Sequence, residues 1–231
     1  MYDRFFAFGC SYTKYKWPTW ADIIAKDLEI PYYNYALPGL GNVAIMHEII
    51  AADLEHTFTD NDLIIIVWTH WSREDRFNDS GWKNGGSVFN NEFYDKTFVK
   101  KHWSYANDIV KNSTAIISIN KLYKDKVAYQ AHIMQPSSHE GSNNTSTLSS
   151  KEKDLMDFYK PHLPFAHVLD EHPSYFFDNH PSVGGHLKFV DEYIYPSLGL
   201  LLKESTVAIY EKIETQMQKV KSSNRIPEFK V

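Results

Sequence analysis

The chain has 231 residues, 43% of them hydrophobic and 15% aromatic, and its formal charge is −5. This length allows one large domain or one domain with an appendage, and the composition excludes a collagenous, low-complexity or largely disordered protein. The charge balance shows no basic excess for nucleic acid, no apolar run is long enough to cross a bilayer, and a single cysteine excludes a disulfide framework or a Cys-rich zinc site. Since no secretory signal is apparent, we expect a cytoplasmic protein that binds neither nucleic acid nor membrane.

The first elements alternate between strand and helix patterns. Residues 4–8 (RFFAF) form a short apolar run that ends at Gly9, as expected for a buried strand followed by a turn. Thr19 then precedes apolar residues at helical spacing, and Asp22 stands three residues later, as in a capping box. Residues 31–36 are a weaker strand candidate.

A second helix and the strongest strand follow. Asn42 is placed to cap a helix whose apolar residues recur on one face. Residues 63–68 (LIIIVW) are apolar on both faces, as expected for a covered parallel strand. This β-α-β-α-β order predicts an α/β fold, which we interpret as a three-layer α/β/α sandwich with a mostly parallel, flavodoxin-like sheet.

The rest of the chain is less regular. Residues 70–100 are polar and aromatic without a clear period and predict a long loop or insertion, which a helix over 103–123 and a strand over 127–132 follow. Residues 136–151 have the composition of a mobile loop. A helix over 186–195 closes the pattern.

We expect two parts in the chain. Residues 1–200 form the α/β domain, and residues 201–231 form a C-terminal helix and a frayed tail. The helix is expected to dock on the core, with partner binding as the alternative.

Residues 8–13 (FGCSYT), the first block, place a serine directly after the first predicted strand. An exposed Ser11 at such a turn has access to substrate and to free backbone N–H groups, as a nucleophile requires. The simpler interpretation is a serine that caps a helix. Cys10 is a second candidate nucleophile, although its position predicts a side chain that points inward and packs.

Residues 34–42 (NYALPGLGN), the second block, contain a Pro-Gly turn. Residues 39–44 also fit the dinucleotide fingerprint G-x-G-x-x-A, but the preceding segment is a poor strand and Asp62 lies before the next strand instead of at its end. We therefore expect no cofactor, and interpret the block as a tight turn that exposes the Gly39 N–H and leads to Asn42.

Residues 178–186 (DNHPSVGGH), the third block, combine an acid with a histidine. Asp178 is close enough in sequence to orient the His180 ring and stabilise its protonated form. The alternative is a capped helix start with surface histidines. The eleven histidines match no common ligand spacing, so no metal site is expected.

Together the three blocks, in this order and after predicted strands, resemble the SGNH (GDSL-type) hydrolase superfamily, in particular its phage and bacterial members with a GCS first block. The resemblance implies that Ser11 is the nucleophile, that His180 is the base and that Asp178 holds its ring. It also implies that the Ser11 and Gly39 N–H groups belong to the oxyanion hole.

Two features depart from the family pattern. The acid stands two residues before the histidine instead of three, and residues 67–73 (VWTHWSR) replace the family's Gly-x-Asn-Asp block. The missing Asn leaves Thr69, His70 or Asn42 as the further oxyanion donor. Arg73 and nearby tryptophans are either packing residues or a rim that binds sugar or acyl groups.

The resemblance thus implies a serine esterase that acts through an acyl-enzyme on a small-molecule or carbohydrate ester, for example in O-deacetylation of a sugar. Two alternatives stay open. One is a non-catalytic carbohydrate-binding module on the same fold, which the missing Asn favours. The other is an O-acyltransferase that uses the same residues.

Overall fold

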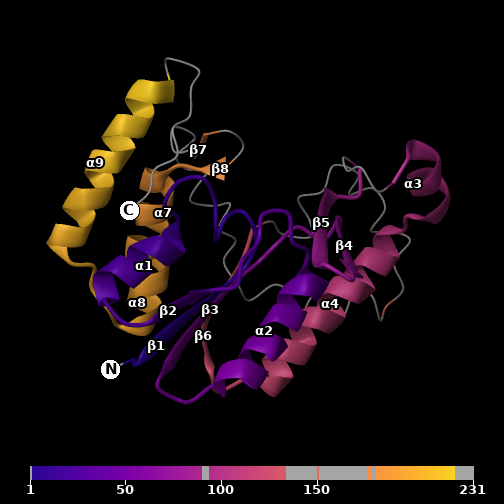
Figure 1. The fold of residues 1–231 in the computed structure, drawn as a ribbon, viewed down its shortest axis with the longest axis horizontal. Coiled ribbons are helices and arrows are strands. Elements are labelled where there is room, and N and C mark those ends of the chain that lie inside the picture. Colours follow the sequence, from indigo (N-terminus) through magenta and orange to yellow (C-terminus); the bar gives the residue numbers. More distant parts are fainter. Residues whose placement is uncertain (1, 90–93, 134–149, 151–175, 178–179, 222–231) are drawn as a thin grey trace.

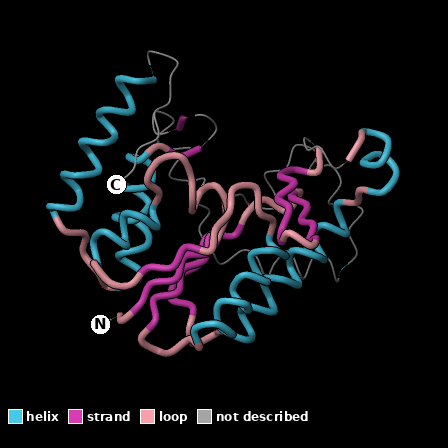
Figure 2. Tube along the Cα trace, in the orientation of Figure 1, coloured by secondary structure: helices cyan, strands magenta, loops and turns pink. Residues whose placement is uncertain are grey.

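Four parallel strands form the central sheet of the protein, in the order β2-β1-β3-β6 (Figures 1 and 2). Their bounds are Arg4–Phe8 for β1, Tyr32–Asn34 for β2, Asp62–Trp68 for β3 and Val127–His132 for β6. The computed structural model describes residues 2–89, 94–133, 150, 176–177 and 180–221. Because the strands are parallel and joined by crossovers, their carboxyl ends meet at one edge of the sheet. The first two sequence blocks directly follow the ends of β1 and β2.

Helices cover both faces of this sheet, which confirms the predicted three-layer α/β/α fold. Helices α2 and α4 pack together on one side, and α1, α7, α8 and α9 lie on the other (Figure 1). The bounds are Trp20–Leu28 (α1), Asn42–His56 (α2), Tyr105–Leu122 (α4), Val183–Phe189 (α7), Tyr195–Leu198 (α8) and Glu204–Lys221 (α9), with a π-helical turn, η4, at Val190–Ile194.

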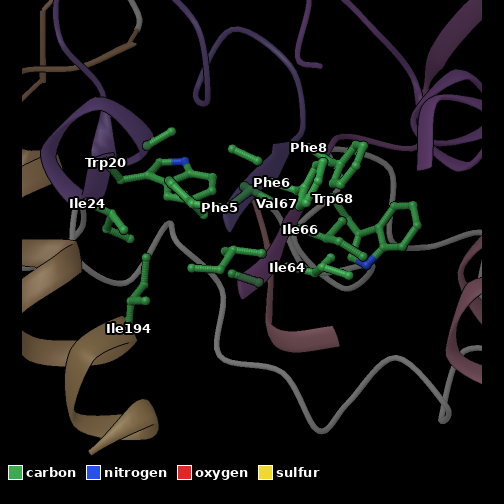
Figure 3. Packing of buried hydrophobic residues seen from close by; sticks show 14 of the residues in the cluster. Phe5, Phe6, Phe8, Trp20, Ile24, Ile64, Ile66, Val67, Trp68 and Ile194 are labelled. Atoms are coloured by element: carbon green, nitrogen blue, oxygen red, sulfur yellow. The ribbon is translucent and has the colours of Figure 1, made fainter. Parts of the chain in front are cut away.

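The packing of strand β1 explains why the central strands of the sheet are apolar on both faces. Phe5 packs against Trp20 of α1, with ring centroids 6.2 Å apart, while Phe6 packs against Phe58 on the opposite face, at 4.9 Å. Figure 3 shows Phe5 and Trp20 on one side of the sheet and Phe6 on the other. Residues 5–8 and 63–68 are completely buried, so the continuous apolar runs reflect a strand covered from both sides.

Residues 70–100 contain regular structure that the sequence pattern does not reveal. Strand β4 (Arg73–Asn78) and strand β5 (Gly81–Ser87) form an antiparallel hairpin, and helix α3 (Lys96–His102) follows. The outer half of β4 is exposed. A hairpin that buries little surface does not need alternating apolar and polar residues. For this reason the sequence pattern predicts a loop where the structure has two strands.

The C-terminal segments extend the predictions at several points. The helix expected over 186–195 begins earlier, at Val183, and runs through η4 into α8. Of the expected mobile loop at 136–151 only residue 150 is described, and the frayed end from 222 lies outside the described residues. Within the described part of the chain, no helix combines the length and the apolar character needed to cross a membrane.

Candidate active site

The first block forms a tight turn at the carboxyl end of β1. The Cys10 carbonyl accepts hydrogen bonds from the Thr13 N–H at 2.9 Å and the Lys14 N–H at 3.1 Å. The first N–H groups of such a helical turn have no partner within the turn. Accordingly, the Ser11 N–H donates to no protein atom among the described residues. The turn therefore presents Ser11 together with a free backbone donor.

Gly9 is required at the start of this turn because two atoms approach its Cα closely. A Cβ at this position would lie 2.1 Å from Thr13 Oγ1 and 3.0 Å from the Val67 carbonyl oxygen. Contacts below 3.0 Å force the neighbours to move. The glycine thus lets the turn fold back against the end of β3.

The second block forms a β-turn beside the first block. The Leu40 N–H donates to the Leu37 carbonyl at 3.2 Å, and Gly39 has φ +86°. Proline at the second position and glycine with positive φ at the third are typical of a type II turn. The Gly39 N–H donates to no protein atom in the described part of the chain, so two unused backbone donors follow the adjacent strands β1 and β2.

The third block reaches the first block from the far end of the chain. His180 lies in β8 (His180–Pro181), which pairs with β7 (Phe176–Phe177). Its ring stacks on Tyr15 with centroids 3.9 Å apart and lies 5.4 Å from the Tyr12 ring. Trp17 fixes this position, because its Nε1–H donates to the Pro181 carbonyl at 2.8 Å. The expected base therefore lies beside the residues that follow Ser11.

The expected triad is only partly visible. Ser11 is 4% exposed, and its hydroxyl donates to Cys10 Sγ at 4.0 Å, the only hydrogen bond of this side chain within the described residues. Asp178, the expected third member, lies outside the described residues. Cys10 itself is completely buried, as its inward position predicts.

Asn42 holds the third-strand loop instead of capping its helix. Its Oδ1 accepts the Thr69 N–H at 2.8 Å, and its Nδ2 donates to the Thr69 carbonyl at 3.1 Å and to Asn112 Oδ1 at 2.8 Å. An amide has two N–H donors, so both are occupied. The N-cap of α2 is Gly41. In this arrangement the Asn42 side chain positions Thr69 and has no N–H left for an oxyanion.

Thr69 and His70, the other candidate donors, differ in what they offer. The Thr69 hydroxyl donates its single proton to Cys10 Sγ at 3.3 Å. His70 Nδ1 accepts the Ser72 N–H at 3.2 Å. Because Nδ1 is then an acceptor, the proton of the neutral His70 ring lies on Nε2. These hydrogen bonds thus use the side-chain donors of Asn42 and Thr69, and they place the His70 proton on Nε2.

Arg73 extends from the hairpin toward both loops. Its Nη1 donates to the Leu40 carbonyl at 3.5 Å. Burial raises the pKa of the Tyr12 phenol above its usual value, the electrostatic interaction with Cys10 raises it further, and the Arg73 charge lowers it. The structure thus brings Arg73 to the second block, and its charge acts on Tyr12 of the first.

The tryptophans near the site are buried or hydrogen-bonded to neighbouring side chains of the protein. Trp68 and Trp71 are buried. The indole N–H groups of Trp82 and Trp103 donate to His47 Nδ1 at 3.0 Å and to Asp108 Oδ2 at 2.8 Å. The packing interpretation of these residues therefore accounts for their surroundings.

Asp75 is a site residue that sequence reasoning missed. Its carboxylate accepts the Gly41 N–H at 2.7 Å and the Ala44 N–H at 3.1 Å, and so caps helix α2 from the hairpin. A Cβ on Gly41 would lie 2.5 Å from Asp75 Oδ2. The one available signal was a helix start with Gly41 at the cap, since glycine has no side chain to accept these N–H groups. Tyr15 and Trp17, the contacts of His180, carry no comparable signal.

Two observations on the described residues concern metal ions and dinucleotides. No three His, Cys, Asp or Glu side chains among them lie close enough together to hold a metal ion. Asp62 begins β3 and binds Arg4 at 2.6–2.7 Å. It therefore lies at the amino end of the strand, away from the turn at Gly39, where a dinucleotide would not reach it.

Comparisons with known proteins give structural neighbours only. No family model matches the chain, and no curated protein matches it. Among solved structures, a lipolytic protein of the G-D-S-L family from Veillonella parvula is 13% identical, with 82% of this chain and 97% of that chain covered and a TM-score of 0.47. A psychrotrophic esterase from Pseudoalteromonas sp. is 8% identical, with 91% and 99% covered and a TM-score of 0.43.

A lipase/acylhydrolase from Enterococcus faecalis is 13% identical over the whole of both chains, with a TM-score of 0.34. These neighbours include proteins of the family that the three sequence blocks resemble. At such identities and TM-scores, the similarity assigns no activity to this chain.

Proposed function

We propose that the protein is a serine ester hydrolase in which Ser11 attacks the carbonyl carbon of the substrate. The observation that carries this proposal is the position of His180, whose ring contacts Tyr12 and Tyr15 although it follows Ser11 by 169 residues in the sequence. Such a juxtaposition of a serine turn and an imidazole is what nucleophilic catalysis requires. The resemblance of the three blocks to SGNH hydrolases supports the same roles.

The reaction follows from these groups. His180 takes the proton of the Ser11 hydroxyl as Oγ bonds to the carbonyl carbon, and the tetrahedral oxyanion accepts hydrogen bonds from the Ser11 and Gly39 N–H groups. His180 then protonates the leaving alcohol. Water attacks the resulting acyl-enzyme by the same route and releases the acid. In this proposal Asp178 orients the imidazole, and the substrate is an O-acylated small molecule or sugar.

A second function, binding without catalysis, is favoured by one observation. The Ser11 hydroxyl donates to the Cys10 sulfur and not to an imidazole in the described residues. A serine that no base activates does not react with electrophiles at an unusual rate. Such a protein would hold an ester or a sugar in the same place and release it unchanged.

Fluorophosphonate labelling and p-nitrophenyl acetate hydrolysis separate the two functions. We expect the wild type to take up one label and to hydrolyse the ester, and Ser11→Ala to lose both, because the hydroxyl is the attacking group. Ser197→Ala is the matched control, since Ser197 lies in α8 and donates to the Ile194 carbonyl. Equal activity in wild type and Ser11→Ala removes Ser11 from the mechanism, and a wild type without label supports the binding function.

A further inference from the structure

The Arg73 side chain reaches the candidate site from outside the three blocks. It lies at the first residue of β4, at the base of the hairpin. Its Nη1 lies 3.5 Å from the Leu40 carbonyl oxygen, which follows Gly39 directly, and its charge acts on the phenol of Tyr12, which follows Ser11 directly. The guanidinium therefore lies beside the loop of the second block, and its charge also acts on the first block.

This guanidinium has no acidic partner among the described residues. Arg73 is half-buried and takes part in no ion pair there. By contrast, Arg4 binds Asp62 through two nitrogens at 2.6 and 2.7 Å. A guanidinium carries five N–H donors. Arg73 uses one of them, at a distance beyond the 2.7–3.2 Å that is usual for such bonds.

Asp75, two residues along the same strand, does not supply the missing charge. Its two carboxylate oxygens accept the Gly41 and Ala44 N–H groups of α2. Among charged side chains, Lys111 has the largest effect on its pKa. Since a partly desolvated cation is normally paired in a protein, the free donors of Arg73 are suited to an anion that enters from solvent.

We propose that Arg73 binds a carboxylate of the substrate, so that the site prefers esters that carry a negative charge over neutral esters of the same shape. This inference rests on the proposed function and names the substrate class for it. The planar fork of a guanidinium matches a carboxylate with two parallel hydrogen bonds. The formal charge of −5 disfavours a dianion such as a phosphate monoester more than a single carboxylate.

Two matched pairs of esters test the preference and locate the charge. Mono-p-nitrophenyl adipate and its methyl ester differ by a charge on the acyl side, and 4-acetoxybenzoate and its methyl ester differ by a charge on the alcohol side. For at least one pair we expect the wild-type kcat/KM to be about tenfold or more higher for the charged member, which corresponds to about 1.4 kcal/mol. The ratio of the two kcat/KM values within a pair does not depend on the fraction of a variant that is folded, because both esters are assayed with the same protein.

The variants assign the preference to Arg73. Arg73→Gln is expected to lower the ratio to about one, and Arg73→Lys to keep part of it, because an ammonium is a point charge without the planar fork. Arg76→Gln is the matched control. Arg76 is exposed on the same strand and donates to the Tyr94 hydroxyl at 2.6 Å, so the wild-type ratio should persist.

Calorimetric titration with the products, adipate and 4-hydroxybenzoate, separates this inference from the proposed function. If no ester is hydrolysed but one product binds to wild type and not to Arg73→Gln, the hydrolase is wrong and the anion site stands. If esters are hydrolysed with ratios near one and neither product distinguishes wild type from Arg73→Gln, the anion site is wrong and the hydrolase stands.

Discussion

His186 shows how burial separates two histidines of the same block. It is 1% exposed, whereas His180 is half-buried at the candidate site. Burial and the charge of His180 lower the pKa of His186 from 6.5 to about 3. His186 is therefore neutral wherever the protein is folded near neutral pH, and it cannot serve as a second acid or base there.

The unfolding free energy of the His186→Gln variant should fall less steeply with decreasing pH than that of the wild type. In the unfolded chain a histidine binds a proton near pH 6.5, so between about pH 6.5 and 3 the unfolded state binds more protons than the folded state and stability falls as pH falls. Glutamine removes this contribution. Urea unfolding at pH 7, 6, 5 and 4 measures it.

Asp108 affects the pH dependence of stability in the opposite direction from His186. Its effect should therefore be easier to detect in the His186→Gln variant. Burial raises its pKa to about 6, so the folded state takes up a proton between about pH 6 and 4 and gains stability as pH falls. His102→Gln, a change at an exposed histidine of α3, is the control for losing an imidazole. Identical slopes in wild type and His186→Gln would show that the buried ring is protonated in the folded state.

At the scale of elements, helix α2 depends on the hairpin for its cap. Asp75 of β4 occupies the place that the side chain of an N-cap residue would take, and Gly41 leaves room for it. The second block lies directly before α2. The contact therefore also fixes the turn at Gly39 relative to the hairpin that carries Arg73.

Asp75→Ala should cost about 1–2 kcal/mol of unfolding free energy, because it leaves the Gly41 and Ala44 N–H groups without an acceptor. The neighbouring Glu74→Ala removes a partly exposed ion pair with Lys111 at 2.9 Å and should cost less than about 1 kcal/mol. Urea midpoints with unchanged m values measure both.

A double-mutant cycle provides the control for that cap. Gly41→Ala places a Cβ against the Asp75 carboxylate, so its cost should shrink when Asp75 is already alanine. If Asp75→Ala costs no more than Glu74→Ala, or if the two changes at 41 and 75 simply add, the carboxylate is not the cap.

The caps of helices α1 and α2 show which features of an element the sequence can predict. The cap of α1 is local, and Asp22 Oδ2 accepts the Thr19 N–H at 2.8 Å as the spacing predicts. The cap of α2 comes from Asp75, 34 residues beyond the N-cap Gly41 and outside any sequence window. Short-range rules describe contacts within one or two turns, so a cap supplied by another element escapes them.

At the scale of the molecule, the sheet was predictable and the surroundings of the site were not. Continuous apolar runs identify covered strands, and alternation with helices implies that the ends of β1, β2 and β3 share an edge. Which side chains meet there depends on packing between distant segments. Thus His180 could be expected near Ser11, but its contacts with Tyr15 and Trp17 could not.

Helix α9 lies on the same side of the sheet as α7 and supports the part of the third block that begins α7. Glu214 Oε2 accepts the Gly184 N–H at 2.7 Å, and Ser182 Oγ accepts the Gly185 N–H at 3.4 Å. These bonds hold the first turn of α7, which begins three residues after His180. The position of the expected base therefore depends on a helix at the far end of the chain.

Glu214→Ala should lower kcat for an ester substrate of the proposed hydrolase about tenfold with a smaller change in KM, because a displaced base weakens the transition state more than binding. Glu214→Gln keeps an acceptor oxygen and should recover most of the loss. Glu211→Ala, at an exposed position of the same helix, is the matched control. Equal kcat in Glu214→Ala and Glu211→Ala would show that α9 does not support the base.

The order of the blocks along the chain has a consequence for synthesis. Ser11 and Gly39 leave the ribosome well before His180, which follows Ser11 by 169 residues. At about 5–20 residues per second this interval lasts roughly 10 to 30 s. In the proposed hydrolase, a nascent polypeptide would carry an ordinary alcohol throughout that time and acquire reactivity toward esters only after His180 has also emerged.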